Sequence, residues 1–284
     1  MKPSGLKRLL DRLYREYSLD CLSLDPLELV RIYKDPGDRE IAGFIAVSLA
    51  LGRAELIRKA VTEVLERMGP SPYRFVFRYD PRSDSKKFHG FVYRFFRAAD
   101  LQLLMVWMHR IIREHGNLGE FFLSGYHASD NNIGPALSRF VRGMLGLEVP
   151  ESLRPAFKKG AGLRPFLADP ADGSACKRLN LFLRWMVRKD ALDLGIWTGV
   201  SPSKLVIPLD THIARLGKRL GLTMRNTPDW KMALEITQSL RAFDPDDPVK
   251  YDFALCTIGK LQACPDPLDR AKCADCPLIL HCKA

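Results

Sequence analysis

The sequence lacks any uninterrupted apolar run long enough to cross a bilayer, and residues 1–20 are charged, without an apolar signal core. We therefore expect a cytoplasmic protein that makes no membrane contact. Internal repeats and low-complexity tracts are also missing, which excludes repeat architectures. Acidic residues are the minority, because 33 Asp and Glu stand against 44 Lys and Arg, for a net charge of +11. A basic surface of this kind favours polyanionic partners.

The sequence also shows no sustained alternation of apolar and polar residues, so a large sheet is not expected. Apolar residues recur at helical spacing instead, as in the stripe of Leu6, Leu9, Leu10, Leu13 and Tyr14. With 46% hydrophobic residues in 284, the chain can bury a substantial core. We predict an all-α fold. Helices are expected at residues 5–18, 38–51, 54–68, 90–115, 132–146, 175–189, 210–220, 229–242 and 247–261.

One stretch breaks the helical pattern over many residues. Residues 148–174 contain four prolines and three glycines, among them Gly160, and such a long connector indicates a junction between regions. A second Gly- and Pro-containing loop is expected at 190–208. The predicted organisation is an N-terminal helical region at 1–150, a second helical region at 151–262 and a C-terminal loop at 263–284.

Cysteines are few but unevenly placed. Cys21, Cys176 and Cys256 have mostly apolar or helical surroundings and are expected in the core. The other four have the spacing C-x8-C-x2-C-x5-C, which can place four thiolates around one metal centre. An iron–sulfur cluster and structural zinc both accept four Cys ligands. Zinc sites more often pair two CxxC knuckles, so the single knuckle favours iron–sulfur. The ligands would be Cys264, Cys273, Cys276 and Cys282.

A second motif surrounds Asp210. The segment Val206-Ile-Pro-Leu-Asp210-Thr-His212-Ile-Ala-Arg215 precedes and opens a predicted helix that ends near Gly221. Asp210 stands at the N-cap position, where an aspartate usually serves only to accept a backbone hydrogen bond.

Together, the two motifs resemble the endonuclease III branch of the helix-hairpin-helix DNA glycosylases. That branch ends in a C-x2-C-x5-C box around a [4Fe–4S] cluster, although here the first gap is two residues longer. It also carries an aspartate followed by Thr-His and a basic residue, as do Asp210, Thr211, His212 and Arg215 here. The resemblance covers about residues 170–284. It implies two helical lobes around a DNA-binding cleft, a structural cluster and a damaged base flipped from double-stranded DNA.

The resemblance also implies residue roles. Asp210 would stabilise positive charge on the sugar or deprotonate the nucleophile. Lys177 opens a predicted helix upstream of Asp210, which is similar to the placement of the nucleophilic lysine in archaeal 8-oxoguanine glycosylases. Lys204 is an alternative amine. DNA contacts are expected from Arg178, Arg184, Arg188, Lys204, His212 and Arg215.

Two other functions remain open. No Gly-x-Gly hairpin precedes Asp210, so the chain can instead be a non-catalytic, nucleic-acid-binding iron–sulfur protein with a glycosylase-like fold. A redox or regulatory iron–sulfur protein would not need the Asp210 segment. We expect a monomeric DNA N-glycosylase, with or without lyase activity on abasic sites. Trp185 and Trp197 are expected in the core rather than against a base.

Overall fold

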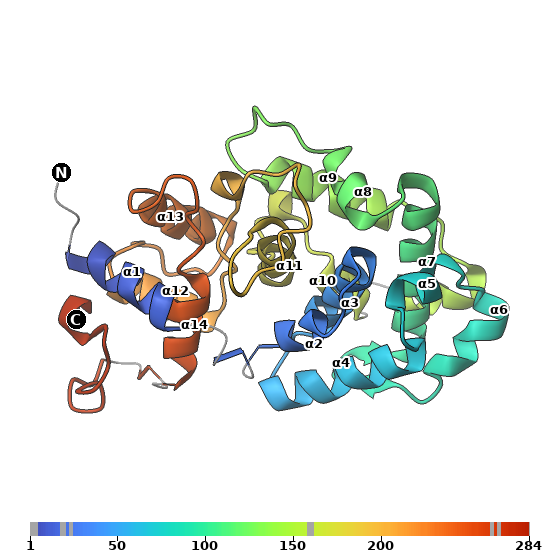
Figure 1. Ribbon diagram of the computed structural model, residues 1–284, viewed down its shortest axis with the longest axis horizontal. Coiled ribbons are helices and arrows are strands. Elements are labelled where there is room, and N and C mark those ends of the chain that lie inside the picture. Colours follow the sequence, from blue (N-terminus) through green and yellow to red (C-terminus); the bar gives the residue numbers. More distant parts are fainter. Residues whose placement is uncertain are drawn as a thin grey trace.

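The computed structural model describes residues 5–17, 21–22, 25–157, 162–261, 264–265 and 268–283. The described chain is mainly helical, as predicted (Figure 1). Within these ranges, no helix combines the length and apolar character needed to cross a membrane. The helices are α1 (Gly5–Glu16), α2 (Leu27–Arg31), α3 (Pro36–Ser48), α4 (Ala54–Met68), α5 (Pro72–Phe77), α6 (Pro81–Asp84), α7 (Ala98–His115), α8 (Leu118–Leu123), α9 (Gly134–Leu145), α10 (Leu163–Phe166), α11 (Lys177–Val187), α12 (Thr211–Arg219), α13 (Trp230–Arg241) and α14 (Asp252–Leu261).

The prediction of a helix at residues 90–115 is wrong for residues 90–97. Residues 92–97 form an antiparallel hairpin of β1 (Val92–Tyr93) and β2 (Phe96–Arg97), and α7 begins only at Ala98. Positive φ angles at Gly90 (75°) and Arg94 (53°) break the helix. Aromatic and β-branched residues also favour extended backbone, so the apolar residues that suggested a helix are equally compatible with a hairpin.

The predicted connector at 148–174 carries short helical segments. Besides α10, it holds 3₁₀ turns at Glu151–Phe157 and Pro170–Asp172. Residues 158–161, Gly160 among them, lie outside the described residues. The connector therefore contributes side chains to the interior, and Leu163 and Phe166 are buried.

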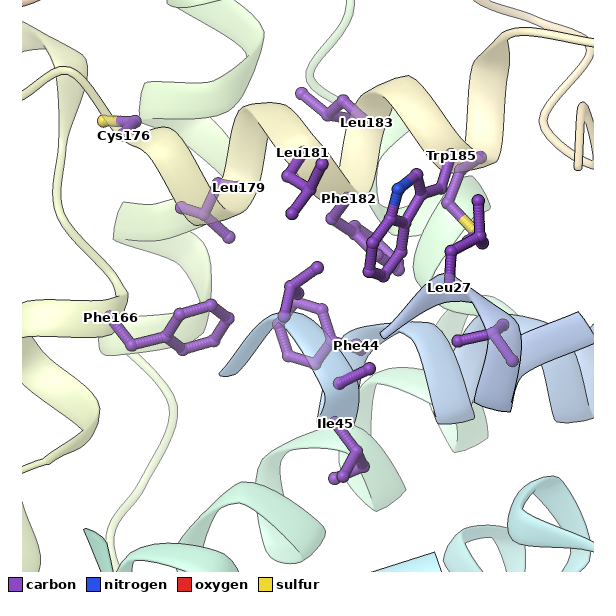
Figure 2. Close-up of a cluster of buried hydrophobic side chains, with 14 of the residues drawn as sticks. Leu27, Phe44, Ile45, Phe166, Cys176, Leu179, Leu181, Phe182, Leu183 and Trp185 are labelled. Carbon is purple, nitrogen blue, oxygen red and sulfur yellow. The ribbon is translucent and has the colours of Figure 1, made fainter. Parts of the chain in front are cut away.

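Helix α3 packs against α11 through a cluster of buried apolar side chains (Figure 2). Phe44 of α3 meets Phe166 and Phe182 edge-on, with ring centroids 5.3 and 5.1 Å apart. Trp185 and Trp197 are 0% and 6% exposed, which confirms their predicted place in the core.

The N-terminal helix packs beside the C-terminal part of the chain (Figure 1). The hydroxyl of Tyr251 donates to Asp11 Oδ1 at 2.7 Å, which joins α1 to the start of α14. One continuous buried core includes Leu13, Leu179 and Leu278, and so draws on all three predicted regions. The division at residues 150 and 262 stays a prediction about domain organisation.

Candidate active site

A cavity of about 930 Å³ lies where the first residues of α11 and α12 meet α14 and residues 50–54. Asp210 and Lys177, the two predicted catalytic residues, both line it. Because α11 and α12 are separated in sequence by a long loop, only tertiary packing brings the carboxylate and the amine together. The volume is in the range of ligand-binding pockets.

Asp210 performs two tasks in this cavity. Its Oδ1 accepts a hydrogen bond from the Ile213 amide at 2.8 Å, so the predicted N-cap is present. Its Oδ2 accepts from the Cys256 thiol of α14 at 3.4 Å. Burial, and next the charge of Asp210, raise the pKa of Cys256 to about 12. The thiol therefore keeps its proton at neutral pH and remains a donor.

Lys177 is the first residue of α11 and is half-buried. The preceding residue, Cys176, has a φ of 47° in the left-handed region and caps the helix start without a side-chain cap bond. Its buried thiol donates to the carbonyls of Ala168 and Ser174 at 3.1 and 3.3 Å. A non-glycine residue in this region costs roughly 1 kcal/mol or more, so tertiary contacts hold this turn in place.

Sequence reasoning missed the contribution of α14. Asp252, Cys256 and Lys260 all line the cavity. Their spacing of four residues places them on one face of the helix, which is the pattern that could have revealed them. Burial opposes the charge on Lys260, but Cys256, Asp25 and Asp210 raise its pKa overall. Lys260 is thus a second amine at the cavity.

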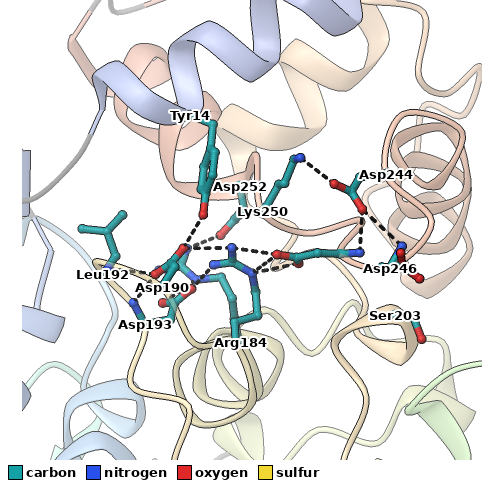
Figure 3. A network of polar contacts seen from close by, with 12 residues as sticks. Tyr14, Arg184, Asp190, Leu192, Asp193, Ser203, Asp244, Asp246, Lys250 and Asp252 are labelled. Carbon is teal, nitrogen blue, oxygen red and sulfur yellow. Dashed lines mark hydrogen bonds and ion pairs between the residues drawn. The ribbon is translucent and has the colours of Figure 1, made fainter.

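The structure argues against the predicted DNA contacts of Arg184 and Arg188 on the protein surface. These side chains are 2% and 3% exposed and cannot reach a phosphate on the surface. Arg184 pairs with Asp193 at 3.2 Å and Asp252 at 2.5 Å (Figure 3). Arg188 pairs with Asp190, Asp193 and Asp247. Carboxylates from the following loop, from the loop before α14 and from α14 itself cover these two arginines.

Three further predicted DNA contacts donate to backbone carbonyls. Arg178 reaches Ser48 at 2.9 Å and Pro165 at 3.0 Å, and burial lowers its pKa to about 10. Lys204 donates to Asp130 at 2.7 Å and does not line the cavity. Arg215 donates to the carbonyl of Cys264. These donors hold neighbouring segments of the protein together, which argues against the predicted phosphate contacts.

His212 lines the cavity and is half-buried. Its Cβ packs against Gly259 of α14, where an added Cβ would lie 2.8 Å away. Among the described residues, neither Nδ1 of His212 nor Nη2 of Arg184 has a hydrogen-bond partner, although both atoms are buried. Because both residues line the cavity, a polar ligand could satisfy them. The predicted phosphate contact of His212 stays a prediction.

The C-terminal cysteine segment contacts α12 at both of its ends. Nη1 of Arg219 lies 3.5 Å from Cys264 Sγ, and the amide of Lys283 donates to the Arg219 carbonyl at 2.7 Å. Burial first, and then the neighbouring cysteines, raise the pKa of Cys282 to about 11. Within the described ranges, no three Cys, His, Asp or Glu side chains form a ready metal site. The donor set itself, four thiols of which Cys264 lies beside a guanidinium, fits a thiolate-bound metal centre.

Fold and site together define a mainly helical protein with one cavity lined by three carboxylates, of Asp25, Asp210 and Asp252, and by two amines, of Lys177 and Lys260. Residues 25–261 match the family described as "Protein of unknown function (DUF2400)", and the chain belongs to this family. The matched region includes every cavity-lining residue, whereas α1 and the four cysteines lie outside it. No curated protein and no solved structure matches the chain. Its membership of the helix-hairpin-helix glycosylases remains a prediction.

Proposed function

We propose that this protein is a DNA N-glycosylase that removes a damaged base from a nucleotide flipped into the cavity. The observation that carries the proposal is the convergence of Asp210 and Lys177 on that cavity. A flipped nucleotide needs a pocket of this size, and breaking its glycosidic bond needs a negative charge beside the sugar. The net charge of +11 supports a polyanionic substrate.

The chemistry assigns a task to each side chain. As the glycosidic bond breaks, the base leaves with the bonding electrons and takes up a proton, and positive charge builds on the sugar. The Asp210 carboxylate offsets that charge. The amide of Ile213 and the thiol of Cys256 hold its two oxygens in position.

The identity of the nucleophile determines whether the strand is cut after base release. If the Lys177 amine forms the new bond to C1′, ring opening gives a Schiff base from which the strand can be cleaved. If a water activated by Asp210 forms that bond, base release is hydrolytic and the strand stays intact. Lys260 is the other amine at the cavity, but its raised pKa favours the protonated form, which is not a nucleophile.

The four cysteines would hold a [4Fe–4S] cluster, with zinc as the alternative. When bound, the cluster would serve as a structural crosslink for the C-terminal loop. Arg219 and Arg215 already tie that loop to α12, whose first turn is capped by Asp210. Arg270, Lys272 and Lys283 would then be basic side chains presented to phosphates.

A panel of lesion-bearing duplexes tests the proposal with wild type and Asp210→Asn. Asn also caps helices well, so the variant should fold and bind DNA, but base release should fall by at least about 100-fold. Asp229→Asn is the matched control, because Asp229 caps α13 in the same way, with 2.8 Å to the Met232 amide, and does not line the cavity.

Full activity in Asp210→Asn would remove the proposed role of this carboxylate. If wild type binds the duplexes and releases no base from any lesion, the non-catalytic nucleic-acid-binding function is favoured. If wild type does not bind DNA, both functions are excluded.

A further inference from the structure

The hairpin at residues 92–97 presents an exposed aromatic ring beside the cavity. Phe95, at its turn, is 67% exposed, and Val92 is 63% exposed, whereas the adjacent Phe96 is buried. Two large apolar side chains thus stand in water on one short hairpin, and the contacts that hold this hairpin decide whether it can serve as a contact surface.

One side of the hairpin is fastened to a segment that lines the cavity. The hydroxyl of Tyr93 donates to the Leu51 carbonyl at 2.7 Å. The Arg94 guanidinium lies against Gly52, where an added Cβ would be only 2.5 Å from Nη2. Leu51 and Gly52 both line the cavity, so the hairpin turn forms part of its rim.

The other side is fastened to the segment that leads into α10. A Cβ at Gly162 would lie 2.9 Å from the Phe95 carbonyl oxygen, so the backbones pack closely. Asp100 joins the two segments, because its Oδ2 accepts from the Arg97 amide at 2.8 Å and its Oδ1 from the Leu163 amide at 3.3 Å. Pro165 and Phe166, just beyond, line the cavity.

The turn that carries Phe95 is strained. Within the described parts of the chain, Arg94 and Cys176 are the non-glycine residues with positive φ. Cys176 lines the cavity, and Arg94 lies against Gly52, which also lines it. Such strain persists where surrounding contacts fix the backbone, and it gathers at functional sites. Phe95 is therefore held at the rim by a fixed backbone, so contact with a partner costs little ordering entropy.

The charge around Phe95 indicates the partner. Arg53 and Arg94 are exposed on the hairpin and on the segment beside it, whereas the exposed Arg97 and Arg164 donate to backbone carbonyls of the protein itself. Arginines interleaved with an exposed aromatic ring suit a nucleic acid, whose phosphates pair with guanidinium groups and whose unpaired bases stack on rings. Trp185 and Trp197 cannot supply this contact, because both are buried.

We propose that Phe95 stacks on an unpaired base of DNA next to the nucleotide that occupies the cavity, while arginines around it contact the phosphates. This inference rests on the proposed function only in taking DNA as the ligand, and it does not require base release.

The test uses a duplex with 2-aminopurine as a central unpaired base. Wild type should quench its fluorescence by stacking, and Phe95→Ala should abolish the quenching and weaken binding about tenfold or more. Phe95→Tyr keeps a ring and should behave as wild type. Met224→Ala removes another exposed apolar side chain, 89% exposed and outside the cavity lining, and should change neither quantity.

Salt titration separates stacking from phosphate contacts. Phe95→Ala should lower the affinity by the same factor at every salt concentration. Arg53→Gln, at the cavity rim, should reduce the slope of log K against log salt by about one.

Unchanged affinity and quenching in Phe95→Ala, with wild type binding normally, overturns the stacking proposal and leaves the proposed function standing. Failure of wild type to bind any DNA removes both. Two other outcomes also overturn the proposal. Phe95→Ala can leave DNA binding unchanged and abolish self-association, which assigns the ring to contact with a second copy. It can instead leave DNA binding unchanged and abolish binding to anionic vesicles, which assigns the ring to a membrane surface.

Discussion

The thiol of Cys256 donates a hydrogen bond across 3.4 Å to Oδ2 of Asp210 and thereby ties the middle of α14 to the first turn of α12. The two helices pack closely enough that Gly259 has no room for a side chain beside His212. The orientation of the carboxylate thus depends on a helix that begins more than 40 residues later in the sequence.

Removing this donor should slow base release without unfolding the protein. Cys256→Ala should lower the single-turnover rate about tenfold, because a hydrogen bond to a charged group is lost. Cys256→Ser keeps a donor and should restore most of the rate. DNA affinity should be unchanged in both variants. A wild-type rate in Cys256→Ala would show that the cap bond alone positions Asp210.

Replacing Arg184 should affect stability rather than surface binding of DNA. Arg184→Met leaves Asp252 buried without its arginine partner and Asp193 paired with Arg188 alone, which costs about 3–5 kcal/mol of unfolding free energy. Arg12→Met is the control, because the Arg12–Glu16 pair is exposed and should contribute less than about 1 kcal/mol. Urea unfolding measures both. If Arg184→Met leaves the stability unchanged but weakens DNA binding, Arg184 contacts DNA as first predicted.

Asp252 should make the free energy of unfolding fall as the pH rises from about 4 to about 6. Burial raises its pKa from 3.8 to about 6, although Arg184 opposes the shift. The folded state therefore holds the proton more tightly than the unfolded chain. Its contribution to stability is full below about pH 4 and is lost as the pH rises through about 6.

Comparison with Asp252→Asn isolates this carboxyl from others that titrate in the same range. The difference in unfolding free energy between wild type and variant should change between about pH 4 and 6 and be constant above pH 7. A difference that is constant throughout would mean that Asp252 stays ionised in the folded protein.

Borohydride trapping shows which lysine amine, if any, attacks the sugar. If Lys177 is the nucleophile, wild type should form a covalent adduct with the right lesion, and Lys177→Ala should lose it and keep binding. Lys260→Ala is the matched variant, because that amine lines the same cavity. An adduct that survives in Lys177→Ala but not in Lys260→Ala assigns the role to α14. Base release without any adduct indicates a water nucleophile.

Metal analysis tests the four-cysteine prediction. Protein purified without oxygen should be yellow-brown, with broad absorption near the blue, and should contain iron and sulfide. Cys276→Ser should lose the colour and reduce solubility, since metal binding and local folding are coupled. Cys21→Ser is the control, because Cys21 lies outside the predicted ligand set. Stoichiometric zinc without iron would refute the cluster.

The sequence by itself determined the helical class and the approximate bounds of most long helices. Helix ends depend on neighbouring residues, so Asp210 before α12 and Gly69 after α4 mark them directly. The spacing of the four cysteines is likewise a local property, which allowed a metal centre to be predicted without any knowledge of the fold.

Only the tertiary structure decided which charged residues are available. Whether Arg184 is solvated or buried depends on Asp193 and Asp252, and their distance from it is set by how distant helices pack. The same is true of the cavity, where Lys177, Asp210 and Lys260 meet from three helices, and of Phe95, whose hairpin is held by residues far away in sequence. Helical periodicity reports which face of a segment is apolar, but not which other segment will cover the polar face.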